Sequence, residues 1–204
     1  MYVPLLAYLV SCLGCGLGLV CTNRARTGTR TSRGLWLAWS AVSIGGTGIW
    51  GMHFIGMLGV AVHGSEVRWN GLLTVLSLAT AILVVGAGMF LVSYGPSRLR
   101  TLLFAGLITG IGVAAMHYTG MAAMRVQGSI GYDLPLVAAS VAIAVAAATA
   151  ALWITRDVRR RLAMAAAVPI MGLAVSGMHY TGMAAANIVV DTGAPVPVGI
   201  GMEA

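Results

Sequence analysis

Charged residues are scarce in this chain of 204 residues, and lysine is absent. Only 8% of the residues are charged, whereas soluble globular domains carry about 25%. All twelve basic residues are arginine, and only five residues are acidic. Together with 59% hydrophobic residues and a mean hydropathy of +0.92, this scarcity argues against a soluble enzyme and predicts a protein of the lipid bilayer.

Six stretches are long and apolar enough to cross a membrane, and none of them contains Asp, Glu, Lys or Arg. They are residues 3–21, 35–62, 72–92, 102–124, 134–154 and 162–186. The second stretch is long enough to need a tilt or a kink, which Gly45, Gly46 and Gly48 can supply. We therefore expect an all-α fold, a six-helix transmembrane bundle.

The arginines lie in alternate loops. Three connections are rich in them: the first holds Arg24, Arg26, Arg30 and Arg33, the second Arg98 and Arg100, and the third Arg156, Arg159, Arg160 and Arg161. The remaining loops carry only Arg68 and Arg125. The positive-inside rule then predicts a multi-pass protein of the bacterial cytoplasmic membrane with both termini extracytoplasmic. We expect membrane lipid, and no nucleic acid, as the partner of this positive charge.

A short motif recurs three times. Residues 116–123 and 178–185 both read MHYTGMAA, and residues 52–57 read MHFIGM. The histidines fall at positions 53, 117 and 179, so the steps are 64 and 62 residues, and each step covers two spans. We infer three parallel two-helix repeats, at about 1–64, 65–128 and 129–190, followed by a short extracytoplasmic tail at 191–204.

Each copy of the motif places an imidazole and a thioether four residues apart, on one helix face. The pairs are His53 with Met57, His117 with Met121, and His179 with Met183. Ionisable groups inside a span usually mark a site, and the combination of imidazole with the soft thioether favours copper. Five further residues are expected either to pack or to form a second tier of ligands: Met52, Met116, Met178, Tyr118 and Tyr180.

Two sets of glycines repeat with the histidines and are expected to allow close helix packing: Gly46, Gly110 and Gly172, and Gly56, Gly120 and Gly182. From the rise of about 1.5 Å per residue, we place His117 roughly 10 Å below the outer end of its helix. We expect His53 and His179 to lie roughly 12–15 Å below theirs. The sequence therefore predicts three ligand pairs at a similar depth in the outer half of the membrane.

The triple motif resembles that of the MHYT domain, a bacterial integral-membrane sensor domain named for this tetrapeptide. Residues 116–119 and 178–181 match the name letter for letter, and residues 52–55 form a divergent first copy. The resemblance covers about residues 1–190 and implies a six-helix module that binds copper near the outer face. It also implies sensing of a diatomic gas such as oxygen, CO or NO. Many members carry cytoplasmic domains that make or degrade cyclic di-GMP.

Three functions remain open from the sequence. The first is a copper-containing membrane sensor that acts through a separate signalling protein, because the short tail leaves no room for an output domain. The second is a small copper or electron transporter, and a purely structural membrane subunit is a third possibility. We expect no enzymatic activity, since the spans contain no carboxylate pair and no acidic partner for a catalytic triad.

Overall fold

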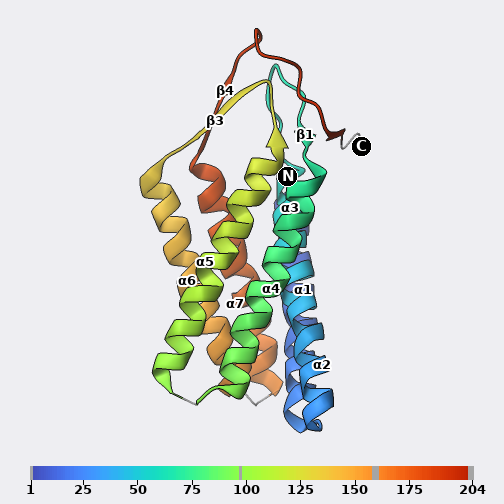
Figure 1. Ribbon diagram of the computed structural model, residues 1–204, viewed down its shortest axis with the longest axis vertical. Helices are drawn as coiled ribbons and strands as arrows, with labels where there is room; N and C mark the ends of the chain where they lie inside the picture. The colour runs from blue at the N-terminus through green and yellow to red at the C-terminus, as the bar shows by residue number, and fades with distance from the viewer. Residues whose placement is uncertain (1, 97, 158–160, 202–204) are drawn as a thin grey trace.

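The structure is a computed structural model that describes residues 2–96, 98–157 and 161–201. Six helical rods run side by side along its long axis (Figure 1). Among the described residues, five helices are long and apolar enough to span a membrane: α1 (Val3–Thr27), α4 (Gly71–Tyr94), α5 (Leu99–Ala123), α6 (Leu134–Asp157) and α7 (Arg161–Ala184). Arg159, Arg160 and the last three residues of the predicted tail lie outside the described ranges.

The second rod is continuous but consists of three parts: α2 (Arg30–Ala41), the π-helix η1 (Val42–Gly51) and α3 (Met52–Met57). The three glycines that the sequence offered for a kink all lie in η1, where the winding is wider than in an α-helix. The predicted end of this span at Val62 is wrong, because the helix stops at Met57. The following loop contains Gly64, whose φ of 86° is a left-handed conformation that favours glycine.

The rods form a closed ring in chain order. Each one packs against the next along the chain, and α7 packs against α1. The three rods that carry the motif also meet one another, through contacts among α3, α5 and α7. Both chain termini lie at the same end of the bundle (Figure 1). The arginine-bearing connections lie at the other end, called here the arginine-rich end.

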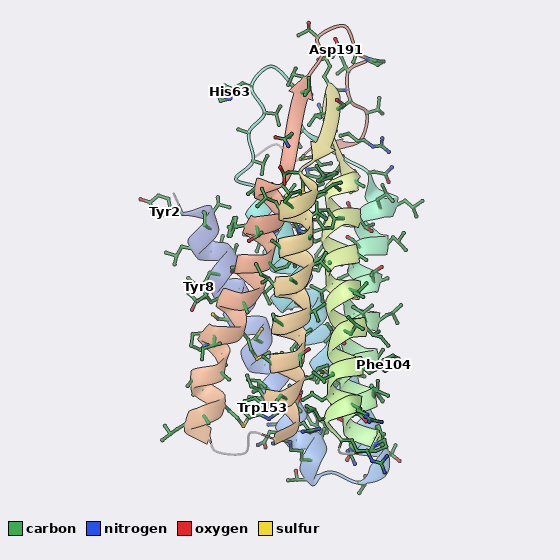
Figure 2. The ribbon with its side chains drawn as sticks, turned by 90° about the vertical axis from the view of Figure 1, so that its left-hand side faces the viewer. Tyr2, Tyr8, His63, Phe104, Trp153 and Asp191 are labelled. Carbon is green, nitrogen blue, oxygen red and sulfur yellow. The ribbon has the colours of Figure 1, made fainter. Side chains whose placement is uncertain are left out.

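The bundle turns its large apolar side chains outward. On α1, for example, Leu5, Leu9 and Leu13 are each more than half exposed, while the residues facing the bundle are small, such as Ala7 and Gly14. Figure 2 shows Phe104 and Trp153 pointing away from the bundle in the same way. Outward-facing apolar side chains suit a lipid environment. The small residues between the helices let their backbones approach closely.

Glycines permit the closest contacts between rods. A Cβ atom added at Gly110 would lie 2.4 Å from the Cα atom of Val145 on α6, so no side chain fits there. In the first copy of the motif, Gly45 rather than the expected Gly46 makes this approach, since its Cβ would lie 2.7 Å from the carbonyl oxygen of Ala81. The π-helix explains this shift, because it accommodates extra residues per turn before His53.

Short strands cover the end of the bundle that holds the termini, called here the strand-capped end. The strict all-α expectation is therefore corrected. β1 (Arg68–Trp69) pairs with β2 (Met124–Arg125) and β5 (Ile200–Gly201), and β3 (Gly128–Tyr132) pairs with β4 (Ala186–Val190). These pairings satisfy backbone groups of the connecting segments, which hydropathy alone does not reveal. Through β5, the tail after residue 190 returns onto the bundle.

Polar side chains begin two of the spans at the strand-capped end. The side-chain oxygen of Asn70 accepts a hydrogen bond from the backbone N–H of Leu73, and Asp133 accepts one from Leu136, each at 3.1 Å. These are N-caps, which satisfy backbone donors at the first turn of a helix. One of the few acidic residues in the chain thus serves to start α6.

Candidate metal centre

Three histidines from three different rods meet inside the bundle. His53 on α3, His117 on α5 and His179 on α7 are each at most 1% exposed. Their ring centroids lie 4.9 to 5.3 Å apart, with the ring planes nearly perpendicular. The Nδ1 atom of His53 lies 3.1 Å from that of His117 and 3.1 Å from that of His179. Positions far apart in the sequence thus form a single cluster, called here the histidine cluster.

The glycine of each motif holds the histidine of another. A Cβ atom added at Gly120 would lie 2.3 Å from His53 Nε2. The corresponding distance is 2.4 Å between Gly182 and His117, and 2.5 Å between Gly56 and His179. The contacts run from the first motif to the second, from the second to the third and from the third to the first. These glycines do more than allow helices to approach, because each forms the wall against which a ring lies.

The two ring nitrogens of each histidine have different surroundings. The three Nε2 atoms are buried, face a glycine and have no hydrogen-bond partner among the described residues. The Nδ1 atom of His53 faces two other Nδ1 atoms, but it carries either one proton or one lone pair. Hydrogen bonds between neutral rings therefore cannot satisfy this arrangement fully. A single cation between the rings would accept all the converging lone pairs.

The histidine cluster lies nearer the helix ends than the sequence suggested. His53 is four residues from the end of α3 and His179 is five from the end of α7, which correspond to about 6 and 7.5 Å. The expected 12–15 Å was wrong because the predicted spans continued to residues 62 and 186. His117 lies about 9 Å from the end of α5, close to its expected depth.

Methionines of the motif lie in two apolar clusters. Met116 and Met178, which precede their histidines, belong to the main core of the bundle, and Met52 is also fully buried. Met57 and Met121 belong to a second cluster with Trp69, and Met183 packs against it. The structure thus places the motif methionines in apolar surroundings, where Met183 is only partly buried, and their role as metal ligands remains a prediction.

An aromatic ring follows each histidine and lies edge-on to it, with centroids 4.8 to 4.9 Å apart. The hydroxyl groups of the two tyrosines differ. Tyr118 shares a 2.7 Å hydrogen bond with Ser140, whereas the Tyr180 hydroxyl is buried without a partner among the described residues. Tyr132, outside the spans, lies edge-on to Tyr118, and its partial burial raises the pKa of its phenol. Of the two motif tyrosines, only Tyr180 has a hydroxyl group without a partner in the part of the chain that the structure describes.

Two serines near the cluster were missed by the sequence analysis. Ser77 on α4 accepts a 3.0 Å hydrogen bond from Trp50. At the equivalent position of the next repeat, Ser140 on α6 shares a hydrogen bond with Tyr118. The first motif has Phe54 instead of tyrosine, so the tryptophan one turn earlier makes the equivalent contact. The sequence contains a signal that could have found them: Ser77 and Ser140 are 63 residues apart, which matches the spacing of the repeats.

An apolar cavity of about 60 Å³ lies in the main core. Met178, which directly precedes His179, lines it, and so does Thr155 near the arginine-rich end. Four sulfur-bearing side chains contribute to its wall: Cys15, Met89, Met171 and Met178. This volume exceeds the roughly 10–15 Å³ needed to admit one water-sized molecule.

These features define an integral-membrane helical bundle with a buried histidine cluster near one end. The family model described as "Bacterial signalling protein N terminal repeat", MHYT, matches residues 46–105 and 110–168. The chain therefore belongs to the MHYT family, as the tetrapeptide indicated. The matched ranges contain the first two histidines of the cluster, and the third follows them.

Several curated relatives are signalling proteins. The chain is 42% identical over 157 residues, or 74% of its length, to the bifunctional diguanylate cyclase/cyclic di-GMP phosphodiesterase MucR of Pseudomonas aeruginosa, and covers 23% of that protein. It is 36% identical over 94% of its length to the cyclic di-GMP phosphodiesterase NbdA of the same organism, covering 25% of it. It is 33% identical over 93% of its length to the signaling protein YkoW of Bacillus subtilis, covering 24%.

The chain thus spans about a quarter of the length of these relatives. No solved structure matches it.

The contact between Gly182 and His117 predicts a specific energetic coupling. Gly182→Ala should destabilise the protein by about 1–3 kcal/mol, because the new methyl group overlaps the ring. In the His117→Ala background the same change should cost at least about 1 kcal/mol less. The measurement is the free energy of unfolding in detergent for the two single variants and the double variant.

Gly177→Ala is the matched control, since it lies on the same helix and a Cβ there meets nothing within 4 Å. Alanine is up to about 1 kcal/mol more favourable than glycine in a helix, and this gain in stability should be the same in both backgrounds. An equal cost for Gly182→Ala with and without the His117 ring would show that the contact does not exist.

Proposed function

We propose that this chain is the membrane sensor module of a signalling system and binds one copper ion in its histidine cluster. The bound metal would receive a diatomic gas such as oxygen, CO or NO. The observation that carries the proposal is the convergence of Nδ1 atoms at 3.1 Å in a cluster that is at most 1% exposed. The chain itself would be non-enzymatic.

The histidine cluster fits a metal ion in its dimensions. Nitrogen ligands about 2.0 Å from one metal ion lie roughly 3.3–3.5 Å apart in tetrahedral or trigonal arrangements. The 3.1 Å separations approach that range, and one ring nitrogen of each histidine lies within 4.8 Å of the others. Only a small adjustment of the rings would be needed to bring the Nδ1 atoms to that spacing.

The neighbouring sulfur atoms favour copper over other metals. Thioethers are soft ligands that select Cu(I), and the spans contain no carboxylate for a hard cation. His53, His117 and His179 would hold the ion through Nδ1, with Met57, Met121 and Met183 as candidate sulfur ligands. The preceding methionines Met52, Met116 and Met178 would form an apolar second tier. When bound, copper supplies a soft centre that can accept a diatomic ligand.

The residues around the histidine cluster have complementary tasks in this proposal. The apolar clusters on both sides exclude water from the site. Tyr180, whose hydroxyl has no protein partner among the described residues, would donate a hydrogen bond to a bound gas molecule. The apolar cavity beside Met178 would hold the gas on its way from the bilayer, because small apolar cavities stay dry and accept apolar ligands.

The proposal includes the orientation of the bundle in the membrane and the receiver of its signal. We place the arginine-rich end in the bacterial cytoplasm, so that both termini and the strand-capped end are extracytoplasmic. The three hairpins would be parallel repeats about an axis along the membrane normal, as the cyclic contacts between histidines and glycines suggest. Since two relatives are named for enzymes of cyclic di-GMP turnover, a protein or domain of that kind is the expected receiver of the signal.

Copper loading tests the site. Detergent-purified protein reconstituted with Cu(I) should hold one copper ion per chain. The triple variant His53→Ala/His117→Ala/His179→Ala should retain less than about a tenth of it, because the nitrogen ligands are gone. His63→Ala is the matched control: this histidine lies on an exposed loop (Figure 2) and its loss should change nothing. Stoichiometric copper in the triple variant, or none in the parent chain, would refute the proposal.

The affinity for CO should distinguish the roles of the two motif tyrosines. Tyr180→Phe should weaken binding of CO to the Cu(I)-loaded chain about three- to tenfold, the effect of losing one hydrogen bond. Tyr118→Phe should leave the CO affinity within about twofold and instead lower stability by about 1 kcal/mol, since its hydroxyl bonds Ser140. The measurements are CO titrations followed by infrared spectroscopy. An equal effect of both variants on CO affinity would contradict the assigned role of Tyr180.

The second candidate is a copper transporter. The four sulfur-bearing side chains of the cavity wall favour it, because they extend soft ligands from the histidine cluster towards the arginine-rich end. Copper uptake by proteoliposomes above the level of empty vesicles would support transport, and its absence in a chain that binds copper supports the sensor.

A further inference from the structure

A second pocket lies at the arginine-rich end, among α1, α2, α4 and α6. Its volume is about 500 Å³, within the roughly 300–1,000 Å³ typical of ligand sites. Three arginines from three rods line it: Arg26 on α1, Arg33 on α2 and Arg156 on α6. The other polar lining residues include Asn23 and Thr27, and none of the described lining residues is acidic.

The structure holds two of these guanidinium groups in place. Arg26 donates a hydrogen bond to the carbonyl oxygen of Thr155 near the end of α6. Arg33 donates one to the carbonyl oxygen of Ser93 near the end of α4, and its guanidinium lies 4.6 Å from the ring centroid of Tyr94. These contacts fix the side chains at the pocket wall, so less conformational entropy is lost when a ligand binds.

The described residues of the pocket wall concentrate positive charge at this end of the bundle. The carboxyl end of a helix carries about −0.5 of an elementary charge, so the ends of α4 and α6 together contribute about −1. Three guanidinium groups contribute three positive charges. Arginine presents five N–H donors in a planar fork that matches phosphate oxygens, so a group that caps a helix can also donate to an anion.

From these observations we infer that this pocket, called here the arginine pocket, binds a phosphate group. The group can belong to a phospholipid headgroup of the adjacent leaflet or to a soluble phosphate-bearing molecule. Basic pockets between transmembrane helices on the cytoplasmic side commonly hold lipid headgroups. The inference does not depend on the metal centre, which lies near the opposite end of the bundle.

The positive-inside rule explains why arginines are at this end, but not why three of them line one pocket. Arg98 and Arg100 lie at the same end and do not line it. They provide a matched control for the number of charges. The double variant Arg33→Gln/Arg156→Gln removes two charges from the arginine pocket, and Arg98→Gln/Arg100→Gln removes two from outside it.

The experiment measures binding of two probes to the full chain in detergent. One is a short-chain phosphatidylglycerol, followed by native mass spectrometry with phosphatidylcholine as the reference lipid. The other is inorganic pyrophosphate, followed by calorimetry. We expect saturable binding that Arg33→Gln/Arg156→Gln weakens by at least about tenfold, because charge-assisted hydrogen bonds to phosphate are lost. The control double variant should change it less than about twofold.

The two probes separate the sources of phosphate. Binding of phosphatidylglycerol alone assigns the pocket to a lipid headgroup, and binding of pyrophosphate assigns it to a soluble ligand. Equal losses in both double variants, or no saturable binding of either probe by the parent chain, would overturn the inference. If the double variant unfolds, Arg156→Gln alone serves as the test, and parent-like binding by that variant would equally overturn the inference.

Discussion

The contact between a histidine ring and the glycine of another motif determines how the three motif-bearing rods come together. Any side chain at Gly56, Gly120 or Gly182 would overlap an Nε2 atom, so the rings can enter the bundle only because these positions lack a Cβ. The same contact closes off one nitrogen of each ring and directs the other towards the centre. A buried cluster of converging Nδ1 atoms follows from this packing, and the proposed copper site rests on it.

The three copies of the motif are related but not equivalent. The first has a phenylalanine and a π-helix, and it uses Trp50 to reach a serine on the next span. The second uses Tyr118 for the corresponding bond, while Tyr180 in the third has no partner among the described residues. A symmetric cluster of histidines therefore has asymmetric surroundings. The proposed hydrogen bond from Tyr180 to a bound gas molecule rests on this asymmetry.

Much of this arrangement was predictable from the sequence because hydropathy and repetition both leave periodic signals. The apolar stretches located the spans, and the repeated tetrapeptide located the histidines. The end of the second span was not predictable, since Leu58, Val60 and Val62 continue the apolar pattern into a loop. The close approach of Gly45 depends on the winding of η1. The contact of each motif glycine with a particular histidine depends on the order of the rods around the ring. No local sequence pattern encodes either feature.

The most direct test of the account concerns the ligands of the bound metal. X-ray absorption spectroscopy of the copper-loaded chain reports the number and type of atoms around the ion. The account predicts three imidazole nitrogens at about 2.0 Å for each copper. A spectrum with one imidazole or none, or with sulfur as the only ligand type, would contradict the central claim that the three histidines share one ion.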